Sequence, residues 1–208
     1  AINCNILPEN VISAPDADSI YDIPLNFERD KLGENILKVL KLRPKPGKHN
    51  NQEWAKMVRN LKTAKDKVKI GIVGKYFATG DFSLGDSYIS VIEAVKHAAA
   101  YNRTKVEIEW INTEEIEKKG VGVLKKLAGI IVPQGWGSRG SEGKIKTIKY
   151  CRENKVPYFG LCYGMQMAVI EFARDVAGLK DANSSEVDSK TKNPVIHIMP
   201  GQAELIKE

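Results

Sequence analysis

A single cysteine lies between two glycines in the segment 160–164, Gly-Leu-Cys-Tyr-Gly. The apolar residues 156–161 predict a buried strand before it. The residues after it predict an amphipathic helix that ends at Gly178, with apolar side chains at helical spacing: Met165, Val169, Phe172 and Val176. Cys162 is therefore expected at a sharp strand-to-helix turn, where the positive end of a helix dipole favours a thiolate nucleophile. The backbone N–H of Tyr163 would then help to stabilise the oxyanion that forms when the sulfur attacks a carbonyl carbon.

The same pattern also fits an ordinary core thiol, because free cysteines are among the most buried residues. A second element upstream favours the nucleophile. The apolar run 128–133 predicts another strand, and the glycine-rich segment 134–143 follows it. In a parallel α/β sheet the loops after the carboxyl ends of the strands line the ligand crevice, so this loop is expected beside Cys162. Its glycines let backbone amides face an oxyanion, although the loop alone fits a flexible surface segment slightly better.

Strands and helices alternate from Val68 onward, which predicts an α/β fold with a doubly wound, mostly parallel sheet. We expect a first strand up to Val73, a helix over 86–101, a strand over 106–111 and a helix before Gly129, followed by the two strand–loop units.

Two further segments precede the α/β domain. Residues 1–42 contain an extended, proline-punctuated stretch over 11–24 and then a helix with Leu32, Ile36, Leu37 and Leu40. Residues 43–66 form a polar linker and a linker helix with Trp54, Met57, Val58 and Leu61 on its apolar face. The predicted division is thus 1–42, 43–66 and 67–208.

Composition narrows the function classes. No apolar run of the 208 residues approaches the ~20 needed to span a bilayer. The three cysteines, Cys4, Cys151 and Cys162, are too widely spaced for a metal pattern or a disulfide framework, which predicts no metal site and fits a cytoplasmic location. The net charge of +6 is scattered over predicted helix faces, so we expect no nucleic-acid partner and no membrane partner. Gly74-Lys75 lacks the rest of a phosphate-loop motif.

Several segments, in order and with similar spacings, resemble the glutamine amidotransferase domain of the CTP synthase family: residues 68–76, 86–94, 133–143, 160–166 and 181–186. Residues 11–24 resemble the end of the amidoligase (synthetase) domain of the same enzymes. The resemblance therefore covers nearly the whole chain. It implies a class I amidotransferase fold for 67–208, C-terminally incomplete, with 1–42 as the tail of the preceding synthetase domain.

The resemblance also implies roles for individual residues. Cys162 would attack glutamine and form a γ-glutamyl thioester, with the Gly135 and Tyr163 amides as the oxyanion hole. The residues implied to bind L-glutamine are Gly135, Trp136, Tyr163, Gln166 and Glu186, of which Glu186 would hold the α-amino group.

For the intact enzyme the resemblance implies a ligase that aminates UTP to CTP. The ammonia from glutamine would reach a synthetase domain that uses ATP and Mg²⁺, with GTP as an allosteric activator and a homotetramer as the assembly. No cofactor is implied within residues 1–208 themselves.

Two departures from the family pattern matter. Gln134 stands where the family usually has glycine, which would impair the oxyanion loop if that position needs a positive φ. Tyr163 stands where the family usually has leucine. The family's catalytic base lies in a His-Pro-Glu motif that this sequence lacks, and its three histidines, His49, His97 and His197, are expected to be structural or solvated, His197 within a strand. We therefore expect little steady-state glutaminase activity from this segment alone.

Two other functions remain open on the sequence. One is a stand-alone α/β cysteine hydrolase, which the stretch 16–24 disfavours because such an enzyme has no need of it. The other is a non-catalytic assembly or regulatory domain of the same fold, which Gln134 and the missing base favour.

Overall fold

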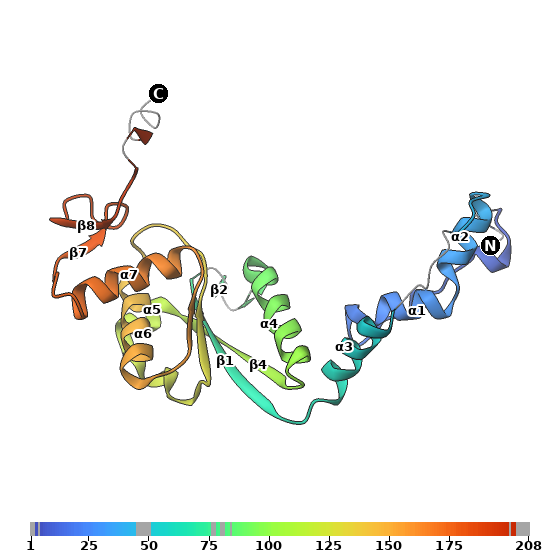
Figure 1. Ribbon diagram of the computed structural model, residues 1–208, viewed down its shortest axis with the longest axis horizontal. Helices are drawn as coiled ribbons and strands as arrows, with labels where there is room; N and C mark the ends of the chain where they lie inside the picture. Colours follow the sequence, from blue (N-terminus) through green and yellow to red (C-terminus); the bar gives the residue numbers. More distant parts are fainter. Residues whose placement is uncertain are drawn as a thin grey trace. The chain divides into compact units, whose positions relative to one another are not determined.

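The computed structural model describes residues 3, 5–44, 51–75, 78–79, 82–83, 85–199 and 201–202 (Figure 1). The chain divides into two compact units. Unit 1 comprises residues 1–65 and 100–104, and unit 2 comprises residues 66–99 and 105–208. The three-part division expected from the sequence stays a prediction.

Unit 1 contains the helices α1 (Ile23–Arg29), α2 (Leu32–Val39) and α3 (Gln52–Thr63). The prediction of extended chain was wrong at its end, because a 3₁₀ turn at Ile20–Asp22 leads directly into α1. The Ser19 hydroxyl accepts a hydrogen bond from the Tyr21 N–H at 3.3 Å, and Pro24 lies in the first turn of α1. Proline is tolerated there because the first N–H groups of a helix have no partner within it.

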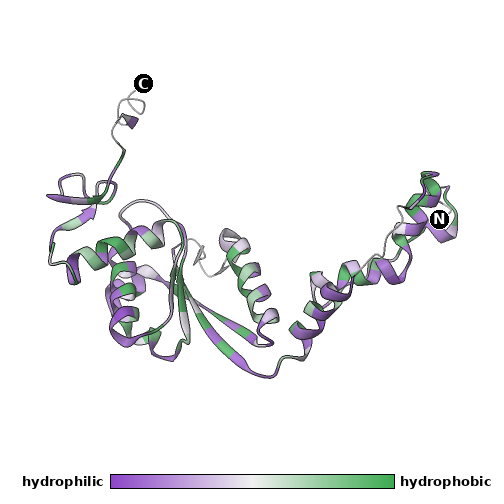
Figure 2. Ribbon diagram, in the orientation of Figure 1, coloured by the Kyte–Doolittle hydropathy of each residue, from purple (hydrophilic) through white to green (hydrophobic). Residues whose placement is uncertain are grey.

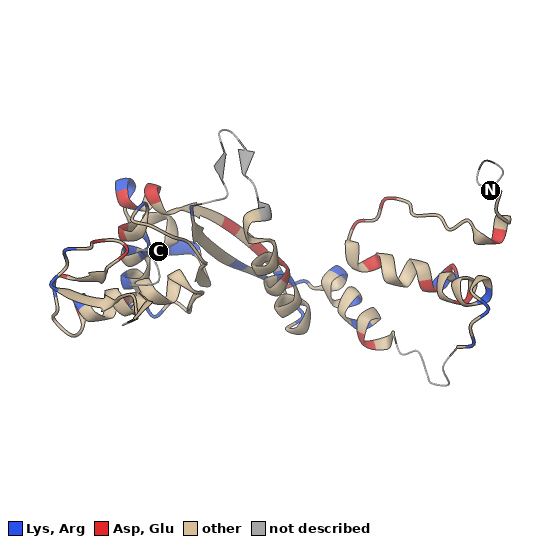
Figure 3. Cartoon of the chain, turned by 90° about the horizontal axis from the view of Figure 1, so that it is seen from above, with Lys and Arg blue, Asp and Glu red and all other residues tan. Residues whose placement is uncertain are grey.

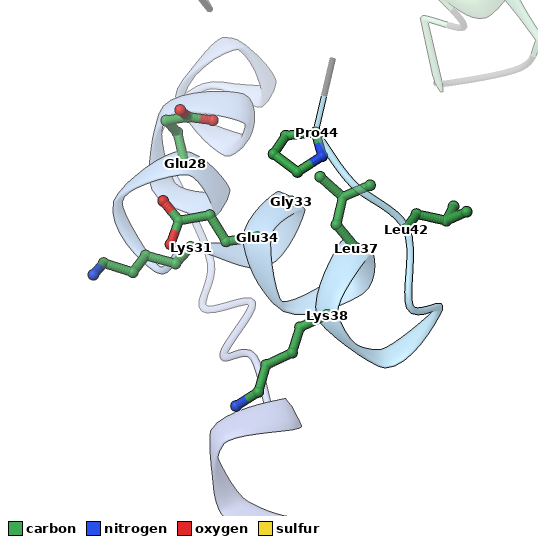
Figure 4. Close-up of a pocket in the computed structure, with 8 residues that line it drawn as sticks. All are labelled: Glu28, Lys31, Gly33, Glu34, Leu37, Lys38, Leu42 and Pro44. Atoms are coloured by element: carbon green, nitrogen blue, oxygen red, sulfur yellow. The ribbon is translucent and has the colours of Figure 1, made fainter. Parts of the chain in front are cut away.

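The predicted linker helix is confirmed as α3, and its contacts within unit 1 are polar as well as apolar. The Trp54 indole N–H donates to the Tyr21 carbonyl at 2.9 Å, and the two rings lie 5.8 Å apart. Unit 1 also has a pocket of about 630 Å³ (Figure 4), with lysine side chains that extend outward; its lining residues are Glu28, Lys31, Gly33, Glu34, Leu37, Lys38, Leu42 and Pro44.

Unit 2 is built on a four-stranded sheet in the order β4-β1-β5-β6, with every neighbouring pair parallel. Its strands are β1 (Lys67–Gly74), β4 (Lys105–Asn112), β5 (Gly129–Val132) and β6 (Tyr158–Gly160). The predicted doubly wound parallel sheet is confirmed. Two smaller pairs lie outside it: β2 (Ala78–Thr79) runs antiparallel to β3 (Phe82–Ser83), and β7 (Ala182–Ser184) runs parallel to β8 (Asn193–Ile196).

Among the described residues, four α-helices accompany this sheet: α4 (Ile89–Tyr101), α5 (Thr113–Lys119), α6 (Ser141–Asn154) and α7 (Tyr163–Asp175). Helices α5, α6 and α7 gather on one side of the sheet, while α4 lies on the other (Figure 1). The expected start of α4 was early, because Gly85–Tyr88 forms a 3₁₀ turn. The buried core beneath α5 and α6 is apolar and consists of Val73, Ile111, Ile116, Leu124, Leu127, Ile130, Val132 and Cys151.

Helix α7 has two apolar faces, and the sequence pattern singled out the one that stays exposed. Met165, Val169, Phe172 and Val176 are 39–55% exposed. The buried face instead carries Tyr163, Met167, Ile170 and Ala173, and the first three of these pack with apolar residues of α6 and β8. Hydrophobic residues therefore recur all along α7 as well as on the strands (Figure 2).

Charged residues of both signs are interspersed along the described parts of the chain (Figure 3). One ion pair joins an exposed arginine to a buried carboxylate: Arg152 on α6 donates from Nε and Nη2 to Glu171 on α7, at 2.9 and 2.8 Å. No helix within the described ranges is both long and apolar enough to cross a membrane.

Two alanine substitutions on neighbouring α7 residues test which face forms the core. Ile170→Ala should lower the free energy of unfolding by about 2–5 kcal/mol, because Ile170 is fully buried. Val169→Ala, at a residue 39% exposed, should lower it by less than about 1 kcal/mol. Urea unfolding curves measure both values. Equal losses, or a larger loss at Val169, would show that the packing of α7 is assigned wrongly.

Candidate functional site

The register of the sheet brings two chain segments to the same level. Val132, the last residue of β5, pairs with Gly160, the last residue of β6. The Leu161 N–H then donates to the Val132 carbonyl at 2.9 Å, which extends the pairing by one residue. The loop after β5 and the turn after β6 therefore begin side by side at the carboxyl edge of the sheet, where α/β proteins bind ligands.

Cys162 lies in the turn between β6 and α7, as predicted, and its side chain is a free, exposed thiol. Its backbone has φ 52° and ψ −107°, a conformation that residues other than glycine rarely adopt. The glycines on either side explain the fit. A Cβ on Gly164 would lie 1.9 Å from the Val132 carbonyl oxygen, and one on Gly160 would lie 2.8 Å from the Gly164 carbonyl carbon. Only glycine lets α7 begin this close to β5.

The second described cysteine lies in a different environment. Cys151 lies on the buried face of α6 and is 2% exposed, and burial raises the pKa of its thiol to about 12. A buried thiol held in its protonated form is inert, so Cys162 is the reactive candidate of the two. Cys4 lies outside the described residues.

The glycine-rich loop over 133–140 contacts the residues next to Cys162. Gly135 is buried, and a Cβ there would lie 3.0 Å from Lys144 Nζ and 3.7 Å from a Tyr163 ring carbon. A side chain at 135 would therefore require the Lys144 ammonium group to shift by a few tenths of an ångström. Gln134 does not have a positive φ, so the structure gives no reason why that position needs glycine. Trp136 is 64% exposed and borders the open side of the loop.

Two lysines lie beneath this loop, against the Tyr163 ring, and we call Lys75, Lys144 and Tyr163 the lysine–tyrosine cluster. The Nζ atoms of Lys75 and Lys144 lie 5.8 and 4.9 Å from the Tyr163 ring centre. Burial, and secondarily the Lys75 charge, lowers the pKa of Lys144 from 10.5 to about 8, while negative charge on Cys162 acts in the opposite direction. Burial and the nearby Arg139 likewise lower the pKa of Lys75.

Glu186 lies in the turn after β7 and reaches the same loop. Its Oε1 accepts a hydrogen bond from the Gly137 N–H at 2.6 Å. The Tyr163 hydroxyl donates to the Gly137 carbonyl, also at 2.6 Å. Gln166, in the first turn of α7, donates its N–H to the Cys162 carbonyl at 3.1 Å. Gly135, Trp136, Tyr163 and Glu186 are thus brought together around the loop, and Gln166 lies one helical turn from Cys162.

Neither of the two described histidines is a hydrogen-bond partner of the Cys162 sulfur. His49 lies outside the described residues. His97 is exposed on α4, and His197 is exposed with its Nδ1 2.8 Å from the Ile198 carbonyl oxygen. The expectation that His197 belongs to a strand was wrong, because β8 ends at Ile196. Within the described ranges no three His, Cys, Asp or Glu side chains form a group that could hold a metal ion.

Sequence reasoning missed Lys144 and gave Lys75 no definite contact. A signal for Lys144 was present, because it recurs at helical spacing with Ile148 and Cys151 on the apolar face of α6. A lysine on such a face is unusual, since lysine is almost never fully buried without a partner.

The doubly wound sheet, with an exposed cysteine in a strained turn at its carboxyl edge, defines an α/β protein of the cysteine-elbow type. The chain belongs to the glutamine amidotransferase class-I family, whose sequence model matches residues 83–205.

Curated relatives resemble the chain over almost its entire length. It is 50% identical over 206 residues to the CTP synthase of Caldanaerobacter subterraneus subsp. tengcongensis, covering 99% of this chain and 37% of that protein. It is 47% identical over 203 residues to the CTP synthase of Pyrococcus abyssi, covering 98% of this chain and 36% of that protein. The chain thus spans little more than a third of the length of these relatives.

A solved structure gives the same likeness in three dimensions. The glutaminase domain of Trypanosoma brucei CTPS, with bound acivicin, matches with a TM-score of 0.57 and 38% sequence identity, over 64% of this chain and 50% of that one. The expected class I amidotransferase fold is therefore confirmed.

The strain at Cys162 is testable without any substrate. Cys162→Gly should be more stable than Cys162→Ala by about 1–2 kcal/mol, because both remove the thiol but only glycine adopts this φ and ψ without strain. Urea unfolding of the two variants gives the difference. If the alanine variant proves equally stable or more stable, the backbone at this turn is relaxed.

Lys144→Met should raise the free energy of unfolding at pH 7 by about 1–2 kcal/mol, because below its folded-state pKa of about 8 Lys144 stays charged despite burial. Between about pH 8 and 10.5 the folded protein loses this proton while the unfolded chain keeps it, so the burial penalty disappears as the pH rises. The gain should therefore shrink between pH 7 and pH 10. Unfolding curves at both pH values measure it, with Lys146→Met, an exposed lysine of the same helix, as the control. A gain that grows with pH would contradict the assigned direction.

Proposed function

We propose that, in the complete protein, glutamine is hydrolysed through Cys162 of unit 2. The sulfur attacks the γ-carboxamide carbon, a C–S bond forms, and the carbonyl oxygen takes up the negative charge. When the C–N bond breaks, the nitrogen leaves with an added proton as ammonia. Water then adds to the thioester, the C–S bond breaks, and glutamate is released with the thiol restored.

The residues around the loop have distinct roles in this proposal. The Gly135 and Tyr163 amides stabilise the oxyanion, a contribution of about 3–4 kcal/mol per donor in hydrolases. Glu186 binds the substrate's α-amino group through its carboxylate, while Gln166 and Trp136 line the glutamine pocket. The single observation that supports this function best is the exposed thiol of Cys162 in a strained turn, directly beside the glycine-rich loop.

The proton donor for ammonia is expected in a His-Pro-Glu motif, which residues 1–208 do not contain. We therefore propose that these 208 residues alone turn glutamine over slowly or not at all, while Cys162 still reacts with an electrophile. Glutamate release by this segment at an ordinary amidotransferase rate would contradict this part of the proposal.

The complete protein is proposed to be a cytoplasmic, homotetrameric CTP synthase. Ammonia from unit 2 would pass to a synthetase domain, where ATP and Mg²⁺ activate UTP for amination and GTP stimulates glutamine hydrolysis. The support is the 44–50% identity to CTP synthases over nearly the whole chain. The same likeness disfavours a stand-alone hydrolase, and the exposed thiol disfavours a non-catalytic domain.

Acivicin, a glutamine analogue found in the related trypanosomal domain, provides the test. In the complete gene product it should label Cys162 and leave the buried Cys151 unmodified, as peptide mass spectrometry can show for each cysteine separately. Glu186→Gln should slow this labelling at least about 10-fold, because the neutral amide loses the charge interaction with the α-amino group.

Iodoacetamide, which has no α-amino group, serves as the matched control. It should alkylate Cys162 at the same rate in the wild type and in Glu186→Gln. Wild-type labelling by acivicin that glutamine does not slow, or labelling spread equally over the cysteines, would refute the glutaminase assignment.

A further inference from the structure

Two lysines hold the glycine-rich loop from beneath by binding its backbone carbonyl groups. Lys75 Nζ donates to the Trp136 carbonyl and, at 3.0 Å, to the Arg139 carbonyl. Lys144 Nζ lies 3.4 Å from the Pro133 carbonyl oxygen. Lys75 is 6% exposed and Lys144 is fully buried, so these contacts form in a region that water hardly reaches. Hydrogen bonds from a charged donor are about twice as strong as neutral ones, so the Lys75 contacts restrain the loop most, whereas the 3.4 Å contact of Lys144 is long for a hydrogen bond.

Tyr163 adds a neutral contact to this arrangement. It is 1% exposed, its ring lies against both lysine ammonium groups, and its hydroxyl donates to the Gly137 carbonyl at 2.6 Å. A leucine at this position, which the family resemblance leads us to expect, would fill apolar space but has no hydroxyl to donate. The contact to Gly137 is therefore made by a group that leucine lacks.

The geometry of the peptide bond transmits these contacts to the other side of the loop. The C=O and N–H of a trans peptide point in opposite directions, so a carbonyl held inward turns the next N–H outward. The Trp136 carbonyl is held by Lys75, and the following N–H, that of Gly137, points to Glu186 and donates to its Oε1 at 2.6 Å. Gly137 itself has φ +70°, and its carbonyl is held by Tyr163. The peptide groups before and after Gly137 are thus both held in place by residues of the lysine–tyrosine cluster.

We propose that Tyr163 is a positioning residue for the amino-acid end of the substrate. Its hydroxyl acts through Gly137 on the Glu186 carboxylate. The hydroxyl restrains the Gly137 backbone, and the Gly137 N–H in turn restrains the carboxylate that binds the α-amino group. This inference rests on the proposed function of Glu186. A purely structural Tyr163, which only fills the core beneath the loop, would affect folding and leave the recognition of glutamine unchanged.

Tyr163→Phe separates the two roles, because it keeps the ring and its contact with both lysines and removes only the hydroxyl. In the complete gene product we expect acivicin to label Cys162 about 3- to 10-fold more slowly at subsaturating concentration, the range that corresponds to one lost hydrogen bond. The loss should lie in the half-saturating acivicin concentration rather than in the maximal labelling rate. Alkylation of Cys162 by iodoacetamide should stay within 2-fold of the wild-type rate.

The decisive comparison measures the effect of Tyr163→Phe in a protein that already carries Glu186→Gln. Because the hydroxyl acts through Glu186, Tyr163→Phe should slow acivicin labelling far less when Glu186→Gln is already present. Fully additive losses in the double variant would overturn the proposal, as would wild-type labelling by Tyr163→Phe. Parallel losses of acivicin and iodoacetamide reactivity would also overturn it, because they would indicate a general disturbance of the Cys162 turn.

Tyr163→Leu keeps the test valid if the phenylalanine variant folds poorly, since leucine is the residue that the family resemblance leads us to expect there. It should reproduce the raised half-saturating concentration. If acivicin labels the wild type without competition by glutamine, the proposed function fails before the role of Tyr163 is reached, so the two failures are distinguishable.

Discussion

The absence of a side chain at Gly164 is the constraint on which the site depends. It lets the first turn of α7 lie against the last residue of β5, whose carbonyl oxygen would otherwise be 1.9 Å from a Cβ. Because β6 is paired with β5 and α7 must start this close, the chain has only Leu161 and Cys162 in which to turn. The unusual backbone angles of Cys162 follow, and so does the exposure of its sulfur at the edge of the sheet.

The region around Cys162 and the glycine-rich loop contains several destabilising features. A strained cysteine typically costs about 1–3 kcal/mol, and Lys144 is buried although burial disfavours its charge. These features cluster around one loop, while the core beneath α5 and α6 consists of ordinary apolar packing. Such a distribution is what a functional site requires, because backbone amides must be held in place before the substrate arrives. The lysines and Tyr163 do this by binding the carbonyls of the loop, which leaves the Gly137 N–H to face Glu186.

The sequence predicted the elements of the site better than their packing. Strand–turn–helix around Cys162 followed from two glycines and a change in apolar periodicity, and the parallel sheet followed from the alternation of strands and helices. The core face of α7 could not be predicted, because apolar residues lie on both of its faces. Periodicity alone cannot tell whether the face with Val169 or the face with Ile170 packs into the core. The contacts of Lys144 and Tyr163 were equally beyond the sequence, since they depend on a loop that arrives from another strand. The start of α1 at Ile23 was missed because a proline was read as a sign of extended chain.

A crystal structure of the complete protein with acivicin bound would test the central claim most directly. We expect a covalent bond from the inhibitor to the Cys162 sulfur, the Gly135 and Tyr163 amides about 2.7–3.1 Å from the position of the developing oxyanion, and the inhibitor's α-amino group on Glu186. An inhibitor bound elsewhere, or a loop whose amides face away from Cys162 in that complex, would contradict the proposed chemistry.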